Sequence, residues 1–433
     1  MKTHPILIAV SVAVAVVALG TNQAVAAART WDGSDSVNFN LAANWDTLPV
    51  SNQDTLVFSG TSPSGTTLNN DFAADFPIFD MQFTTTSLAY TIGGNDLILK
   101  GNIVLLGVGA SPQIINTNLK LTGGAHIMQA NGGNITLRGV LSDNNGAFPA
   151  SIRKTSTGTL FLQGHNSYTG GTEIQAGAIA INKTDALGTG NITIGSNTTT
   201  GTLVFQTGSA GTYNQTIDLA GTTGGATLTA SQTGGVNLAA DFTATGAGSK
   251  TLTLTGSQVG EISGAIVNNS ASNTTSVAKT QGGGTWTLSG QNTYTGNTTV
   301  SAGTLILADG SQTTFAIGAS GVNNQVIQSD TGILTLDGAF VFDLSGAGTT
   351  LGDAWTIVSG TATYGATFSV LNFTETGVGS GVWEKVNSGV TYQFDQSLST
   401  LSVTAVPESS TWALLGAGLA AMAFLRRSRR LKS

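Results

Sequence analysis

Charged side chains are scarce in this sequence, and cysteine is absent. Only 9% of the 433 residues are Asp, Glu, Lys or Arg, whereas soluble domains carry about 25%. Ser, Thr, Asn and Gln must therefore cover most of the exterior. Without cysteine the chain cannot be a disulfide scaffold, so its stability has to come from packing and from backbone hydrogen bonds.

Basic residues are also unevenly placed. The formal net charge is −7, and five of the 16 basic residues lie at the extreme C-terminus, at Arg426, Arg427, Arg429, Arg430 and Lys432. The absence of a basic patch elsewhere excludes a nucleic-acid partner. Intrinsic disorder is also disfavoured, because 40% of the residues are hydrophobic and they recur along the chain.

The N-terminus predicts a secretory signal peptide over residues 1–28. Lys2 precedes an apolar run from Ile6 to Gly20, and the small residues Ala24-Val25-Ala26 follow. This order is typical of a cleaved leader that is read by the general secretion machinery. An uncleaved anchor is the alternative, but about 15 apolar residues are fewer than the ~20 that span a bilayer.

The C-terminus, residues 406–433, has three parts in order. Val406-Pro407-Glu408 precedes an apolar helix predicted over 412–425, and the arginines Arg426, Arg427, Arg429 and Arg430 follow it. Basic residues after an apolar segment keep that end in the cytoplasm, so the preceding chain would face outward.

This tail resembles the PEP-CTERM sorting signal of diderm bacteria. The resemblance implies recognition of Val406, Pro407 and Glu408 by an exosortase-type enzyme, with transient inner-membrane anchoring before release to the outer surface or matrix. Ser409 stands where the family has a second proline, which leaves the efficiency of sorting open. A permanent tail anchor is the alternative, although the apolar segment is short for a stable span.

Two segments in the middle of the chain repeat each other. Residues 158–181 align with residues 284–307, and Lys154-Thr155 and Lys279-Thr280 match upstream of them. Apolar residues alternate with polar ones between glycine-containing turns, which is typical of short β-strands. Both copies resemble the autotransporter-associated β-strand repeat through the following residues: Gly158, Leu160, Leu162, Gly164, Asn166, Tyr168, Thr169, Gly170, Ile174 and Gly177, and Gly284, Leu288, Gly290, Asn292, Tyr294, Thr295, Gly296, Val300, Gly303 and Leu305.

That resemblance implies an all-β fold, a right-handed parallel β-helix over residues 29–336. Leu, Ile and Val would stack inward from coil to coil, while Asn and Thr would form outward or corner ladders. The repeat units lie at about 139–182 and 264–308. Trp31-Asp32-Gly33 and Ala42-Ala43-Asn44-Trp45 also resemble the usual start of proteins built from this repeat.

Residues 337–405 are richer in aromatic side chains than the repeat region. We interpret them as a C-terminal β subdomain that caps the solenoid, because open repeat ends need covers. A separate binding domain is the alternative, and it would contain an aromatic-lined pocket.

Residues suited to catalysis are few. His165 aligns with Gln291 of the second repeat, so we expect it to face solvent, and nothing marks His126 as part of a triad. Asp71, Asp75 and Asp80 form the one acidic cluster, which we interpret as a strand or loop edge. Asn95 and Asp96 fall in half of a calcium-binding repeat, and a turn is the simpler interpretation. We expect no catalytic, cofactor or metal site.

The sequence thus predicts an exported surface or extracellular-matrix protein of structural or adhesive function, with exopolysaccharide or like chains as the expected partners. Biofilm organisation would be a natural role. A carbohydrate-active β-helix enzyme, lyase or glycoside hydrolase, is one alternative, and a carbohydrate-binding module is the other. An enzyme would need two carboxylates facing one groove.

Overall fold

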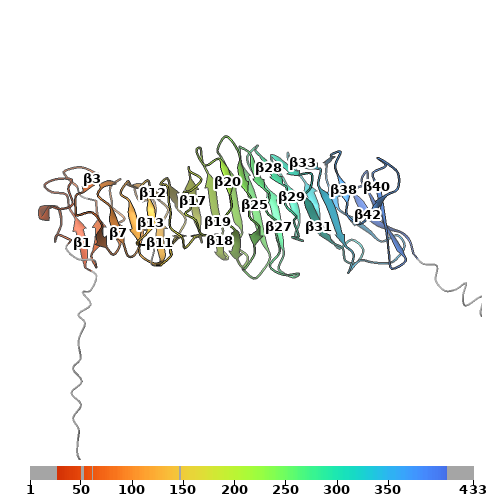
Figure 1. The fold of residues 1–433 in the computed structure, drawn as a ribbon, viewed down its shortest axis with the longest axis horizontal. Coiled ribbons are helices and arrows are strands. Elements are labelled where there is room, and N and C mark those ends of the chain that lie inside the picture. The colour runs from red at the N-terminus through yellow and green to blue at the C-terminus, as the bar shows by residue number, and fades with distance from the viewer. Residues whose placement is uncertain (1–26, 50–52, 61, 146–147, 407–433) are drawn as a thin grey trace, which may run out of the picture.

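The computed structural model describes residues 27–49, 53–60, 62–145 and 148–406, which form an elongated rod (Figure 1). The chain advances from one end of the rod to the other, as the colour from red to blue shows. Strands make up nearly all the regular structure of these residues, and the short 3-10 helix η1 (Ala42–Asn44) is the exception. The all-β prediction is confirmed.

A thirteen-stranded parallel sheet runs along most of the rod. Leu160 pairs with Ile135 of the preceding coil and with Ile179 of the next one, so each coil adds one strand to this sheet. Its strands are β3 (Thr67–Asn70), β6 (Thr91–Gly94), β9 (Gln113–Ile115), β12 (Asn134–Leu137), β15 (Thr159–Leu162), β17 (Gly177–Ile181), β19 (Gly201–Phe205), β22 (Ala226–Ala230), β25 (Lys250–Gly256), β27 (Thr275–Lys279), β29 (Thr298–Val300), β32 (Val326–Gln328) and β36 (Val358–Ser359). The predicted parallel solenoid is therefore confirmed.

Two further parallel sheets complete the coils of the N-terminal half. The ten-stranded sheet contains β1 (Ala28–Trp31), β2 (Thr55–Phe58), β5 (Met81–Phe83), β8 (Ile103–Leu105), β11 (Gly124–Ala130), β14 (Ala150–Thr155), β16 (Thr172–Ile174), β18 (Ile192–Asn197), β21 (Ile217–Gly221) and β24 (Phe242–Thr243). The four-stranded sheet contains β4 (Phe76–Ile78), β7 (Leu97–Leu99), β10 (Leu119–Leu121) and β13 (Leu141–Asp143).

Other parallel sheets complete the coils of the C-terminal half. The seven-stranded sheet contains β20 (Gly211–Tyr213), β23 (Val236–Leu238), β26 (Gly260–Ile262), β28 (Thr285–Leu288), β30 (Thr304–Leu307), β33 (Ile333–Leu336) and β37 (Thr363–Tyr364). The three-stranded sheet contains β31 (Gln312–Ala316), β34 (Ala339–Asp343) and β38 (Ser369–Val370).

The faces that form a coil change along the rod. Strands β14 to β19 alternate between the ten- and thirteen-stranded sheets, whereas β25 to β30 alternate between the thirteen- and seven-stranded sheets. The seven-stranded sheet starts at β20, and the ten-stranded sheet ends at β24. The second sequence repeat is therefore displaced by one face of the solenoid relative to the first.

Aromatic clusters close the core at both ends. At the N-terminal end, Trp31 packs on Trp45 with ring centroids 5.0 Å apart, and Phe39 lies 5.4 Å from each of them. These residues include both tryptophans of the starting motif. At the C-terminal end, Phe340 and Phe394 lie 5.9 Å apart in a larger cluster. Between the ends, buried Leu, Ile and Val alternate with outward residues, as in β15, where Leu160 and Leu162 are buried.

An antiparallel sheet caps the C-terminal end, as the sequence predicted for this region. Its strands are β35 (Ala354–Thr356), β39 (Thr374–Glu375), β40 (Val382–Asn387), β41 (Val390–Asp395) and β42 (Thr400–Ala405). Parallel pairing continues past residue 337, because β34 pairs with β31 and β38 pairs with β34. The last coils and the cap are consequently interleaved in sequence.

Candidate functional site

The tyrosines of the repeat motif point into the rod. The hydroxyl of Tyr168 lies 2.6 Å from Thr172 Oγ1, and that of Tyr294 lies 2.6 Å from Thr298 Oγ1. Burial raises the pKa of both phenols, that of Tyr294 to about 12. These residues hold successive parts of a coil together and are unavailable to a ligand.

The repeat asparagines also lie inside, which corrects the expectation that they could face outward. Asn166 Oδ1 accepts from the Leu141 amide at 2.8 Å, and Asn292 Oδ1 accepts from the Ile266 amide at 3.0 Å. Both side chains are buried. A buried backbone donor needs an acceptor, and an asparagine supplies it where the coil bends away from the ladder.

One lysine in each repeat is buried without a carboxylate. Lys154 Nζ donates to the carbonyls of Thr155, Ser156 and Ala176 at 2.6, 2.6 and 3.3 Å. Burial lowers its pKa to about 8. Three carbonyl dipoles replace water around the ammonium group, so this lysine closes a turn.

The histidines and the acidic cluster do not converge on one place. His126 is buried, with its ring nitrogens 2.6 Å from the carbonyls of Gly101 and Thr122. His165 is exposed, as predicted, and its Nδ1 lies 2.8 Å from Asp185.

The three clustered aspartates each have a different partner. Asp75 pairs with Lys120 at 2.6 Å, Asp71 accepts from the Asn40 amide at 2.6 Å and Asp80 accepts from the Asn102 amide at 2.6 Å. Each carboxylate thus fastens a neighbouring strand or loop, which fits the edge interpretation.

The half calcium motif also makes structural contacts. Asn95 donates to the Phe72 carbonyl, and Asp96 accepts from Asn118. Within the described ranges, no three His, Cys, Asp or Glu side chains come together as a metal site would require.

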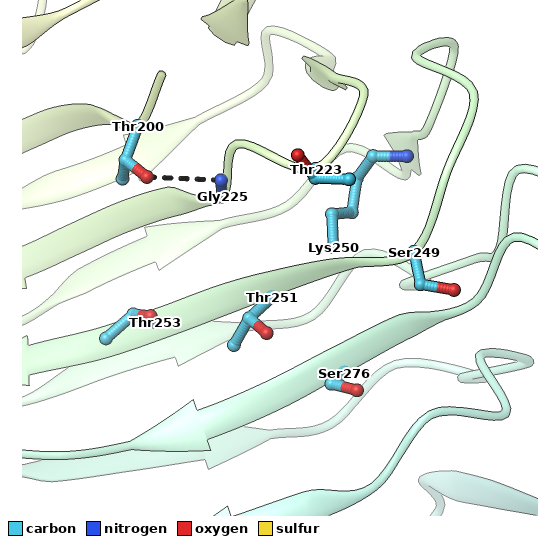
Figure 2. A pocket seen from close by; sticks show the side chains of 8 residues that line it. All are labelled: Thr200, Thr223, Gly225, Ser249, Lys250, Thr251, Thr253 and Ser276. Atoms are coloured by element: carbon cyan, nitrogen blue, oxygen red, sulfur yellow. Dashed lines mark hydrogen bonds between the residues drawn. The ribbon is translucent and has the colours of Figure 1, made fainter. Parts of the chain in front are cut away.

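The outer face of the thirteen-stranded sheet carries a concentration of hydroxyl groups. A shallow hollow of about 330 Å³ lies over β25 and β27 and over the segments that precede β19 and β22, and Figure 2 shows it from close by. We call its hydroxyl-bearing residues the hydroxyl face: Thr200, Thr223, Ser249, Thr251, Thr253 and Ser276. Adjacent to it, Thr229 and Thr255 face each other across the β22–β25 ladder with their hydroxyls 2.8 Å apart.

The hydroxyl face presents no free charge. Lys250 lines the hollow, but it is buried, and its ammonium donates to the carbonyls of Gly246 and Gly248. Thr200 Oγ1 accepts from the Gly225 amide at 3.2 Å (Figure 2), and Ser249 Oγ accepts from the Thr274 amide at 3.1 Å, so two of the hydroxyls are also used within the structure. The remaining hydroxyls can form neutral hydrogen bonds with a ligand that lies across the strands. Neighbouring strands of the sheet are about 4.8 Å apart, which sets the spacing of these contacts.

The predicted sorting residues lie almost entirely outside the described residues. Val406 packs against the core at the end of the cap, whereas Pro407, Glu408, Arg426, Arg427, Arg429 and Arg430 fall outside, as do the predicted signal peptide up to residue 26 and helix 412–425. In the part of the chain that the structure describes, no helix has the length and apolar character to cross a membrane.

Comparison with known proteins supports the repeat assignment. Residues 152–181 and 280–307 match the model of the family described as Passenger-associated-transport-repeat. The chain is also similar to the adhesin BmaC autotransporter of Brucella suis biovar 1 (strain 1330), with 29% identity over 190 residues. That match covers 39% of this chain and 5% of the relative, so this chain corresponds to a small part of that protein. No solved structure matches. Two segments of the chain thus match this repeat family, and they contain the motif residues that carried the predicted resemblance.

Proposed function

Because the chain carries passenger repeats on a parallel β-solenoid, we propose that it is an exported surface protein whose rod acts in adhesion. The observation that carries this proposal is the uncharged hydroxyl face on a rigid, repetitive sheet. The partial similarity to an autotransporter adhesin supports the same role. The expected partner is neutral exopolysaccharide or a neighbouring rod, which would place the protein in a biofilm or extracellular matrix.

The binding mechanism is multivalent. A single hydroxyl that exchanges a hydrogen bond to water for one to a sugar hydroxyl stabilises the complex only slightly, because the net contribution of one hydrogen bond is about 1 kcal/mol. A row of such groups held on hydrogen-bonded strands can engage successive units of a polymer. Each further contact then forms at high effective concentration, so weak single contacts add up to strong retention.

The proposed route to the surface uses both ends of the chain. The signal peptide would direct export, and the PEP-CTERM-like tail would hold the chain in the inner membrane until an exosortase acts at Val406, Pro407 and Glu408. Intact-mass analysis of fractionated native cells tests this route. Mature protein at the outer surface without either end would support it, and a full tail retained in the inner membrane would contradict it.

A direct test of adhesion changes the hydroxyl face. Thr251→Lys combined with Thr253→Lys places two long cations on the hollow, while Thr193→Lys on β18 adds a cation to an outward position of another sheet. We expect the double variant to lose most co-sedimentation with insoluble neutral β-glucans, and the control to retain it. Equal retention by all three proteins would remove the hydroxyl face from the proposal.

The carbohydrate-active enzyme remains the weaker alternative. Hydrolysis by paired carboxylates needs two of them on opposite sides of one bond, and Asp71, Asp75 and Asp80 are engaged with separate partners. We therefore propose a non-enzymatic role.

A further inference from the structure

A pocket of about 930 Å³ opens in the C-terminal cap, away from the hydroxyl face. Its walls come from the segment that contains β37, from the connection between β39 and β40, and from the turn between β41 and β42. This volume lies within the roughly 300–1,000 Å³ typical of small-molecule sites. An aromatic-lined pocket in this region is the feature expected of a separate binding domain.

Three aromatic rings form one wall of the pocket. Phe368 lies 4.8 Å from Tyr364 and 6.4 Å from Trp383, in both cases edge to face. Behind them, Phe368 packs on Phe340 at 4.9 Å and on Phe394 at 6.1 Å. The wall is therefore anchored in the aromatic core of the cap and needs little reorganisation to receive a ligand.

Polar groups stand beside this wall. Glu375 Oε1 accepts from the Gly381 amide at 3.0 Å, which fixes the carboxylate at the rim. The hydroxyls of Tyr364 and Ser399 lie 2.8 Å apart, and the side-chain amide of Gln396 lines the same space. An aromatic surface with a few fixed donors and acceptors is the pattern of a specific binding site.

Trp383 provides a second observation in favour of a ligand site. Its indole N–H is buried and has no acceptor among the described residues. A buried donor without a partner is destabilising. A small shift of the ring on binding an oxygen-rich ligand would remove that cost.

We propose that this pocket binds one to a few sugar rings of a neutral glycan. Pyranose rings combine a C–H face, which packs on aromatic rings, with hydroxyls at the edge, which suit Glu375, Gln396 and Ser399. The lining residues include one carboxylate and neither lysine nor arginine, so an anionic sugar would be repelled. The inference rests on the pocket alone and does not require the hydroxyl face to be adhesive.

Trp383 lines the pocket, so the ¹⁹F resonance of a fluorinated Trp383 can report ligand binding. The full chain, labelled with 5-fluorotryptophan, contains six tryptophans, and Trp383→Phe identifies the ¹⁹F resonance of Trp383. Tetrasaccharides of β-1,4-glucose, β-1,4-N-acetylglucosamine and α-mannose are titrated to millimolar concentration, with tetragalacturonate as the anionic probe. We expect the Trp383 resonance to shift saturably with at least one neutral probe and at least tenfold more weakly with the anionic one.

Three variants test the assignment. Gln396→Ala combined with Tyr364→Ala should weaken binding at least tenfold, while Thr251→Lys with Thr253→Lys on the hydroxyl face should leave it unchanged. Thermal unfolding checks that each protein is folded, and Glu375→Gln provides a milder pocket variant. The proposal is overturned if no neutral probe moves the Trp383 resonance, or if folded pocket variants bind as well as the parent. A shift seen only on adding a peptide of residues 407–433 would overturn it too, by making the chain's own tail the occupant.

Discussion

Lys154 and Lys279 occupy the same position in the two repeats, yet they lie in different sheets. Lys154 is on β14 of the ten-stranded sheet, and Lys279 is on β27 of the thirteen-stranded sheet. Lys279 Nζ donates to the carbonyls of Gln281, Gly282 and Ala302 at 3.1, 3.1 and 3.0 Å, and Lys154 makes an equivalent set. Both repeats thus contain the same kind of lysine–carbonyl hydrogen bonds. In the second repeat these bonds lie on a different face of the solenoid.

Replacing either lysine should destabilise the rod. Lys279→Met keeps the length of the side chain but leaves three carbonyls without their donor, so we expect a loss of about 2–3 kcal/mol. Urea unfolding followed by circular dichroism measures it. Lys100→Met, at a half-buried position, is the control and should cost less than about 0.5 kcal/mol. Equal losses in the two variants would show that the carbonyl contacts contribute nothing.

The stabilising effect of Lys154 should depend on pH. Burial lowers its folded pKa to about 8, whereas the unfolded value is about 10.4. Between these values the unfolded chain binds more protons, so stability rises with pH there. The stability of the parent relative to Lys154→Met should therefore increase from pH 7.5 to 9.5. Urea midpoints at four pH values measure it, and a difference that stays constant or falls would contradict the prediction.

Part of this architecture follows from the sequence and part does not. Alternating apolar residues predicted short β-strands, and the parallel solenoid followed from the resemblance of the two matching segments to the autotransporter-associated β-strand repeat. The displacement by one face was not predictable, because it depends on where β20 begins a new sheet and β24 ends an old one. Both of these strands lie in the coils between the two repeats, outside the segments that match.

The positions of the buried lysines and of the residues that line the cap pocket could not be predicted from the sequence either. A lysine without a nearby carboxylate suggests a surface position, and the only available sign was that Lys154-Thr155 and Lys279-Thr280 match between copies. The pocket was predicted as an alternative from aromatic content alone. Its residues Tyr364, Trp383 and Gln396 come from three separate segments, so spacing along the chain could not bring them together.

Tyr294 should make the rod sensitive to strong alkali. Burial raises its folded pKa to about 12, above the unfolded value of about 10. This group therefore contributes stability that is complete below pH 10 and is lost as pH rises from 10 to 12. Tyr294→Phe should cost about 1 kcal/mol at pH 7 through the lost hydrogen bond to Thr298, and this deficit should shrink or reverse by pH 11. An unchanged deficit in urea unfolding at both pH values would contradict the assignment.

A comparison of Gly303 with Gly310 distinguishes two reasons why a turn can require glycine, a positive φ and the close approach of neighbouring backbone atoms. Both have positive φ, +68° and +76°, which costs another residue about 1–2 kcal/mol. At Gly303 an added Cβ would also lie 2.6 Å from the carbonyls of Gly282 and Gly284, whereas nothing lies within 4 Å at Gly310. We expect Gly310→Ala to cost about 1 kcal/mol and Gly303→Ala about 3 kcal/mol or more, because the clash also displaces Lys279 from its carbonyls. Urea unfolding of the two variants measures the difference, and a larger loss at Gly310 would show that the close approach at Gly303 relaxes without cost.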